Sequence, residues 1–140
     1  MNSKFNPVAG IVILKVMDGD YSVLCLETKH GDYDLTKGHL HPDEDPMTAA
    51  LREAKEEADI TEISFPFGKD TLSVDACEMF VGVTEQIPEI RANPYTGICE
   101  HKKIVWLPIV DAVNSNKIKT FLHPAVMFAY EKVIESRKNE

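Results

Sequence analysis

The order of apolar and polar residues predicts two strands at the start of the chain. Residues 8–16, VAGIVILKV, are almost continuously apolar and rich in β-branched side chains, which is typical of a buried strand. Residues 18–20, DGD, are a turn signal, and residues 21–27, YSVLCLE, predict a second strand. Two strands joined by so short a turn form a β-hairpin.

A polar segment and then a helix are predicted next. Residues 28–45 contain glycines and a proline, so we expect a long loop, and long loops inside compact domains are usually functional or disordered. Asp45 is a suitable N-cap, and Pro46 fits the first helical position, where its missing N–H is not needed. The last helical turn ends near Ala58 or Asp59.

The second half of the chain adds further strands and helices. It contains one or two strands within 72–85, a loop over 86–100, a strand at 103–107, a short helix near 108–114 and a helix over 123–138. No repeated βαβ unit is present in this order of elements. We therefore predict an α/β (α+β) fold, a mixed β-sheet sandwiched between helices, in a single domain over residues 1–140.

Glu53, Glu56 and Glu57 cluster on one side of the predicted helix. At about 100° per residue they share an arc of about 100°. An apolar stripe lies beside this arc and is expected to pack on the sheet. The stripe consists of Met47, Ala50, Leu51, Ala54 and Ala58. The acids are therefore predicted to lie to one side of the packed face, and Arg52, one turn before Glu56, is within reach for an ion pair.

Three carboxylates so close together repel one another unless a cation lies between them. Hard divalent cations such as Mg²⁺ prefer several oxygen ligands and are typically held by carboxylates together with substrate phosphates. A cation site is therefore one interpretation of this cluster. The other is an ordinary acidic helix face in solvent, and these residues alone do not decide between the two.

Composition and charge narrow the range of partners. The chain has 140 residues, of which 44% are hydrophobic and 27% charged, as in ordinary folded domains, and its formal net charge is -8. This charge does not favour an anionic membrane or a nucleic-acid backbone. An anionic ligand would need metal ions or a local basic cluster to recruit it.

Targeting signals and cysteines point to the cytoplasm. No apolar run is long enough for a membrane span, and the N-terminal stretch MNSKFNPVAGIVIL lacks the features of a signal peptide. Cys25, Cys77 and Cys99 are widely spaced without a CxxC pair, which favours reduced thiols over a zinc site or a disulfide framework. We therefore expect a cytoplasmic protein, and the sequence leaves its oligomeric state open.

The acidic cluster is part of a longer pattern. Gly38 is followed after five residues by Glu44, and after seven more by the run REAKEEADI, residues 52–60. This pattern resembles the signature of the Nudix family, G-x5-E-x7-R-E-U-x-E-E-x-G-U, in which U is a bulky aliphatic residue. Ala54 is smaller than the usual aliphatic residue, and Asp59 replaces the glycine at the helix end. Asp tolerates the left-handed conformation expected there.

The resemblance implies a Nudix fold and hydrolysis of a pyrophosphate bond in a nucleoside diphosphate derivative, with Mg²⁺ or Mn²⁺ as cofactor and more than one ion bound. The implied metal ligands are Glu53, Glu56, Glu57, the Gly38 carbonyl and, from a later loop, Glu100. Arg52 would orient a glutamate, and Glu44 would support the loop and helix. Glu57 is our first choice for the base that deprotonates the attacking water, with Glu100 as the rival.

Two flanking segments resemble one branch of that family, the asymmetric diadenosine tetraphosphate hydrolases. Residues 33–40, YDLTKGHL, resemble the stretch W-x-P-P-K-G-H-V, and residues 99–108, CEHKKIVWLP, resemble the segment E-H-x4-W-L. The resemblance implies that Lys37 contacts a phosphate and that His39 assists it. The tryptophan and both prolines of the first stretch are absent from this chain.

Other substrate contacts are open at this level. Tyr33 stands in place of the tryptophan and could stack on a base, as could Tyr95, or either could pack a loop. Lys103, together with Lys102 and Arg91, could supply a local basic patch. Lys102 and Lys103 point to opposite faces of a strand, so at most one of them faces the site.

We therefore expect a hydrolase that cuts diadenosine tetraphosphate to ATP and AMP. Nucleoside triphosphates, sugar nucleotides such as ADP-ribose and a 5′-triphosphate RNA end remain open as substrates. A catalytically silent nucleotide-binding domain is the alternative of another class, and the presence of all three glutamates disfavours it. The expected partner is a small-molecule nucleotide, without stable nucleic-acid or membrane binding.

Overall fold

The structure, a computed structural model, describes residues 7–138. In chain order its elements are β1 (Val8–Met17), β2 (Asp20–Thr28), β3 (Tyr33–Asp34), β4 (Thr36–His39), α1 (Pro46–Ala58), β5 (Leu72–Val74), β6 (Cys77–Val83), β7 (His101–Pro108), α2 (Ile109–Val113), a 3₁₀ turn η1 (Thr120–Leu122) and α3 (His123–Lys138). Across the described residues, none of the helices has the length and apolar character to cross a membrane. The prediction about a signal peptide falls partly on residues outside this range.

The predicted hairpin of β1 and β2 forms, and its strands then separate. They pair antiparallel beside a turn at Asp18 and Gly19, which both have positive φ. Further from the turn, β1 pairs with β4 and β2 pairs with β3. β7 pairs antiparallel with the other edge of β2, from Ser22 to Thr28. β6 runs parallel to β1 on its other side, and β5 pairs with β6. The strands β3 and β4 therefore fill the opening between β1 and β2.

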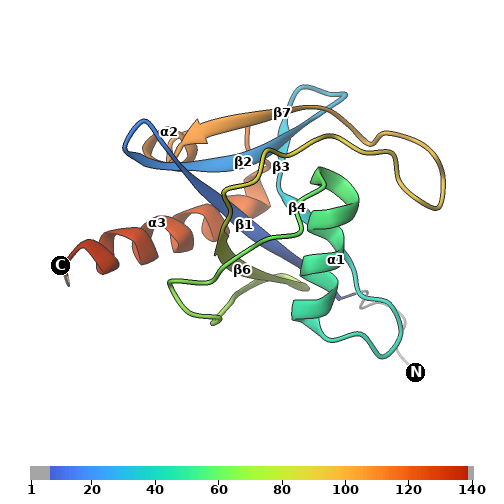
Figure 1. Cartoon of the computed structure of the whole chain (residues 1–140), viewed down its shortest axis with the longest axis horizontal. Coiled ribbons are helices and arrows are strands. Elements are labelled where there is room, and N and C mark those ends of the chain that lie inside the picture. The colour runs from blue at the N-terminus through green and yellow to red at the C-terminus, as the bar shows by residue number, and fades with distance from the viewer. Residues whose placement is uncertain (1–6, 139–140) are drawn as a thin grey trace.

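Side-chain alternation along the strands divides the core into two layers. On one face, Ile11 and Ile13 of β1 pack with the alanines of α1. On the other face, Val12 and Leu14 pack with residues of α2 and α3. Figure 1 shows α1 and α3 on opposite sides of β1 and β6. This arrangement confirms the predicted mixed sheet between helices.

Helix α1 begins and ends as the sequence predicts. The Asp45 side chain accepts a hydrogen bond from the Thr48 N–H at 3.3 Å, and Pro46 is the first helical residue. At the other end Asp59 adopts the left-handed conformation, with φ 56° and ψ 35°. Its N–H donates to the Lys55 carbonyl, which is typical of a helix C-cap. Asp59 therefore fills the place that glycine has in the motif.

Two sequence predictions need correction. The segment 28–45 is not a loop throughout, because β3 and β4 complete the hydrogen-bond ladders that β1 and β2 leave open where they diverge. Leu51 is not part of the packed stripe of α1: it is 37% exposed, whereas Ala49 is fully buried. The stripe is therefore rotated toward the acidic side of the helix.

Candidate active site

Arg52 lies among the acids of α1 and binds three carboxylates. Its Nε and Nη2 donate to the two oxygens of Glu44 at 2.8 and 2.9 Å, in the two-bond geometry that makes such pairs strong. Nη1 donates to Glu53 at 2.9 Å and to Glu56 at 3.2 Å, which includes the ion pair predicted from the sequence. Nη2 also donates to the His39 carbonyl at 2.9 Å. The hydrogen bonds from Arg52 lower the pKa of Glu44 to about 2.

Glu53 and Glu57 lie within the packed face of α1, not beside it as predicted. Around the helix they fall between Ala49 and Ala50, which are both fully buried. The Glu53 side chain is only 13% exposed. Gly38 of β4 permits this approach, since a Cβ at that position would overlap the Glu53 carboxylate. The glycine of the motif therefore makes room for an acid of the motif.

Glu57 contacts the backbone of β4. Its Oε1 accepts a hydrogen bond from the Lys37 N–H at 3.0 Å. Burial, reinforced by the charge of Glu53, raises the pKa of Glu57 to about 9. Burial raises the pKa of Glu53 as well. At neutral pH such a carboxyl holds a proton unless another cation takes the proton's place.

The acids of α1 fit the divalent cation that the motif implies. Their donors are carboxylate oxygens, which hard cations prefer, and a cation beside Glu53 and Glu57 would offset the repulsion and burial that raise both pKa values. Over residues 7–138, no three His, Cys, Asp or Glu side chains already converge as a finished metal site. Glu53 and Glu56 accept hydrogen bonds from Arg52, which fixes the rotamers of both acids beside the cleft.

A second charge cluster surrounds Asp34 of β3, whose side chain is 9% exposed. Its Oδ1 accepts from the Leu35 N–H at 2.9 Å and lies 3.1 Å from Lys37 Nζ. Its Oδ2 lies 3.2 Å from Lys119 Nζ and 3.6 Å from His101 Nε2. Burial opposes ionisation here, but the nearby His101 ring and the charges of Lys37 and Lys119 together hold the pKa of Asp34 well below its usual range.

Both clusters line one cleft of about 360 Å³. The cleft brings together eight residues that the sequence predicts as site residues: Lys37, Gly38, His39, Arg52, Glu53, Glu56, Glu57 and Glu100. Glu100 comes from the end of the 86–100 loop and accepts a hydrogen bond from Asn93 Nδ2 at 2.8 Å. Glu44 does not line the cleft, and it accepts a hydrogen bond from Arg52, which does. Its predicted supporting role requires a contact of this kind.

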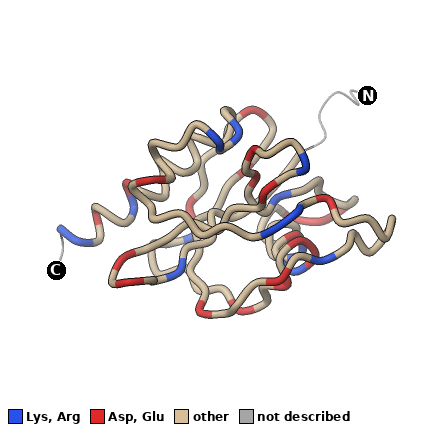
Figure 2. The backbone as a smooth tube through the Cα atoms, turned by 90° about the horizontal axis from the view of Figure 1, so that it is seen from above, with Lys and Arg blue, Asp and Glu red and all other residues tan. Residues whose placement is uncertain are grey.

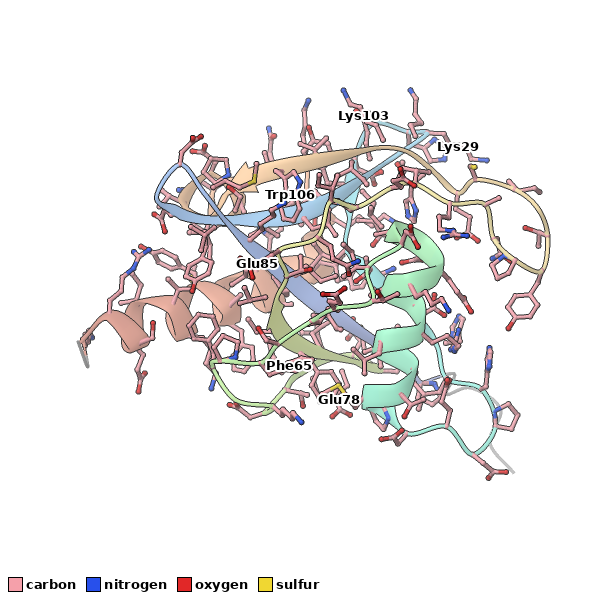
Figure 3. All side chains as sticks on the ribbon, in the orientation of Figure 1. Lys29, Phe65, Glu78, Glu85, Lys103 and Trp106 are labelled. Atoms are coloured by element: carbon pink, nitrogen blue, oxygen red, sulfur yellow. The ribbon has the colours of Figure 1, made fainter. Side chains whose placement is uncertain are left out.

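Tyr33 and Lys103 are not brought to the cleft. Tyr33 is 9% exposed in the core layer on the α3 side, with Lys117 Nζ 5.7 Å from its ring centre. Strand alternation in β3 turns Asp34, rather than Tyr33, to the cleft. Lys103 lies 3.8 Å from Glu27, and Figure 3 shows it on the outer side of β7. The substrate contacts predicted for these two side chains therefore find no support in their positions.

The predicted local basic patch is also absent from the lining. Neither Lys102 nor Lys103 lines the cleft, and Arg91, which does, pairs with Asp59 at 2.6 Å. Figure 2 shows acidic and basic residues intermixed along the described chain. The positive charge at the cleft therefore comes from Lys37, Arg52 and Arg91, each in contact with a carboxylate.

Asp34 is the cleft residue that sequence reasoning missed most clearly. It occupies the variable position of the W-x-P-P-K-G-H-V pattern, so the motif gives no signal for it. The only available signal is its spacing, three residues before Lys37, and that needs the course of β3 and β4 to be informative. His41 and Tyr95 are further lining residues, in edge-to-face contact with ring centres 6.1 Å apart.

Comparisons with known proteins identify the family of the chain. Residues 5–126 match the model of the NUDIX domain family. A protein of Caenorhabditis elegans named bis(5′-nucleosyl)-tetraphosphatase (asymmetrical) is 39% identical over 112 residues, which cover 76% of this chain and 81% of that protein.

Solved structures share the fold. A C. elegans Ap4A hydrolase binary complex has a TM-score of 0.67 at 20% identity and covers 93% of this chain and 98% of its own. The NUDIX domain of Shewanella oneidensis NrtR, complexed with ADP ribose, has a TM-score of 0.64 at 16% identity and covers 95% of this chain and 90% of its own. With the family model matching most of the sequence, the chain belongs to the Nudix family and is a pyrophosphohydrolase.

Proposed function

We propose that this chain is a Mg²⁺-dependent hydrolase of dinucleoside polyphosphates that cuts diadenosine tetraphosphate into ATP and AMP. The observation that carries the proposal is the 39% identity to a curated asymmetrical bis(5′-nucleosyl)-tetraphosphatase over most of both chains. The cleft supports it, because acids that suit a divalent cation and a lysine that suits a phosphate line the same cavity.

The reaction adds water to one phosphorus and breaks its bond to the bridging oxygen, which leaves with the longer phosphate chain. When bound, the divalent cation screens the phosphate charges and acidifies the attacking water. Glu57, once ionised beside that charge, accepts the proton of this water. Arg52 fixes the rotamers of Glu53 and Glu56, and Lys37 contacts a phosphate from the opposite cluster.

A substrate panel tests the proposal. The protein with Mg²⁺ is incubated separately with diadenosine tetraphosphate, ADP-ribose, nucleoside triphosphates and a 5′-triphosphorylated RNA, and the products are separated by anion exchange. We expect ATP and AMP in equal amounts from the first substrate. If the protein cleaves only another substrate of the panel, the proposed dinucleoside polyphosphate substrate is rejected, and the pyrophosphohydrolase activity stands.

The same panel is run with two variants and without metal. Glu57→Gln removes the proposed base while keeping the side-chain size, and chelation removes the cation. Glu85→Gln is the matched control, since Glu85 lies outside the cleft lining. Activity that survives both Glu57→Gln and chelation would contradict the proposed chemistry, whatever the substrate.

A further inference from the structure

Lys119 contacts Asp34, a residue that lines the candidate active-site cleft, through an ion pair. The segment 117–119 runs beside β3, where the Tyr33 N–H donates to the Lys117 carbonyl at 2.8 Å and the Lys119 N–H donates to the Tyr33 carbonyl at 3.0 Å. These bonds fix the backbone from which the Lys119 side chain extends to Asp34. Lys119 itself does not line the cleft, whereas Asp34 and Lys37 do.

The charges of this cluster do not cancel. Two ammonium groups, on Lys37 and Lys119, share one buried carboxylate, that of Asp34. The Leu35 N–H holds that carboxylate in place from the backbone. A single lysine with Asp34 would be a closed neutral pair, and a buried carboxylate that loses its only cation is strongly destabilised. The second lysine supplies a surplus positive charge beside the cleft.

We propose that Asp34 is a positioning residue that holds Lys37 at the cleft, and that Lys119 is the counter-charge that frees Lys37 to contact a substrate phosphate. When Lys37 turns to the phosphate, Lys119 keeps the Asp34 carboxylate paired. This inference rests on the proposed function only in that the ligand is a polyphosphate. It assigns a role to two residues outside the Nudix signature.

Replacement of the counter-charge tests the role of Lys119. In Lys119→Met, Asp34 has Lys37 as its only lysine partner, so Lys37 is withheld from substrate. We expect KM for the pyrophosphate substrate that the wild type cleaves to rise about tenfold, with kcat within about twofold, a coupling of the size measured for groups in one ion-pair network. Lys119→Arg, which keeps the charge, should restore KM.

A matched control separates this role from a structural one. Lys132 also pairs with an aspartate, Asp70, outside the cleft, so Lys132→Met removes a lysine–aspartate ion pair whose carboxylate is exposed and should leave KM unchanged. In Asp34→Asn no carboxylate withholds Lys37, so adding Lys119→Met to it should raise KM by less than about twofold. If the double variant does not fold, the Lys119→Met, Lys119→Arg and Lys132→Met series decides alone.

The outcomes are distinct from those for the proposed function. If the wild type cleaves a different pyrophosphate, the series is run with that substrate. If it cleaves none, calorimetric binding of inorganic tripolyphosphate replaces KM, with the same order of variants expected. An unchanged KM in Lys119→Met, a failure of Lys119→Arg to restore it, or an equal rise in the Asp34→Asn background would overturn the inference.

Discussion

Two charge clusters line the candidate cleft, and they are built in opposite ways. On α1 one cation, Arg52, is shared by three carboxylates. At β3, one carboxylate, Asp34, is shared by two ammonium groups and approached by His101. The first cluster has a surplus of negative charge and the second a surplus of positive charge. A polyphosphate with a bound metal ion carries both signs of charge: the metal ion would balance the acidic cluster, and the phosphates would balance the basic one.

The pKa values of the acids near Arg52 show which of them lacks a cationic partner. Arg52 neutralises Glu44 so well that the pKa of this acid falls to about 2, but Glu57 has no such partner, and its pKa rises to about 9. Glu57, which Arg52 does not contact, and Glu53, whose pKa stays raised in spite of its hydrogen bond from Arg52, are therefore the acids that a metal ion would stabilise most. If a cation of the protein already neutralised every acid of this cluster, a metal ion would gain little by binding there.

The largest expected effect comes from replacing Glu57, the acid of α1 that Arg52 does not contact. Glu57→Gln should lower kcat with Mg²⁺ by about 10²- to 10⁴-fold, the range for loss of a general base. Steady-state kinetics on the cleaved substrate measures it, and thermal unfolding checks that the variant folds. A much larger loss in Glu100→Gln than in Glu57→Gln would move the base to Glu100.

Removing the shared cation of the acidic cluster should have the next largest effect. In Arg52→Gln, Glu53 and Glu56 lose the donor that fixes their orientation, so kcat/KM should fall about 10- to 100-fold, as when a residue that orients a metal ligand is lost. Arg52→Lys should recover only part of it, because an ammonium cannot make the two-bond contact with Glu44. Full activity in Arg52→Gln would show that these glutamates need no such support.

Gly38→Ala, which changes the spacing between β4 and α1, should have a smaller effect. The new Cβ would overlap the Glu53 carboxylate, so either β4 or the acid must move. We expect the free energy of unfolding to fall by about 1–3 kcal/mol, as for other overpacked sites. Denaturant unfolding measures this loss, with Gly97→Ala as the control for a glycine that has nothing near its Cβ position but does have positive φ. A Gly38→Ala protein as stable as the wild type would mean that α1 is not held this closely.

The smallest expected effect is on acid stability. The pKa of Glu44 is about 2 in the folded protein and 4.5 in the unfolded reference, so the unfolded chain binds the proton first as the pH falls. The stability that this group contributes is complete above about pH 4.5 and is lost as the pH falls toward 2. Glu44→Gln should flatten the loss of stability in that window, measured by urea unfolding at several pH values. Equal slopes for both proteins would contradict the strong pairing with Arg52.

The local parts of the site follow from the sequence. The Asp45 N-cap and the ion pair of Arg52 with Glu56 each depend on residues within one or two turns of α1, so spacing alone predicts them. The left-handed Asp59 follows from the family resemblance, because it stands where the signature has a glycine at the helix end. The Nudix signature adds the acids and Gly38 because their separations along the chain match a known pattern.

The non-local parts do not follow from it. Lys119 lies 85 residues from Asp34 along the chain, and no periodicity connects them. Tyr33 and Asp34 form a two-residue strand, too short for alternation to show which side chain faces the cleft. The face of α1 that packs on the sheet was misplaced by a fraction of a turn, because the missing side chain of Gly38 lets acids occupy the buried arc.

Binding of Mn²⁺ in the absence of substrate, measured by calorimetry or electron paramagnetic resonance, tests the division between the two clusters most directly. The wild type, Glu57→Gln and Asp34→Asn are compared at one pH. We predict that Glu57→Gln weakens Mn²⁺ binding by at least about tenfold, whereas Asp34→Asn leaves it within about twofold of the wild type. Equal weakening in both variants, or none in Glu57→Gln, would contradict a cation site on α1 that is separate from a phosphate-binding cluster at β3.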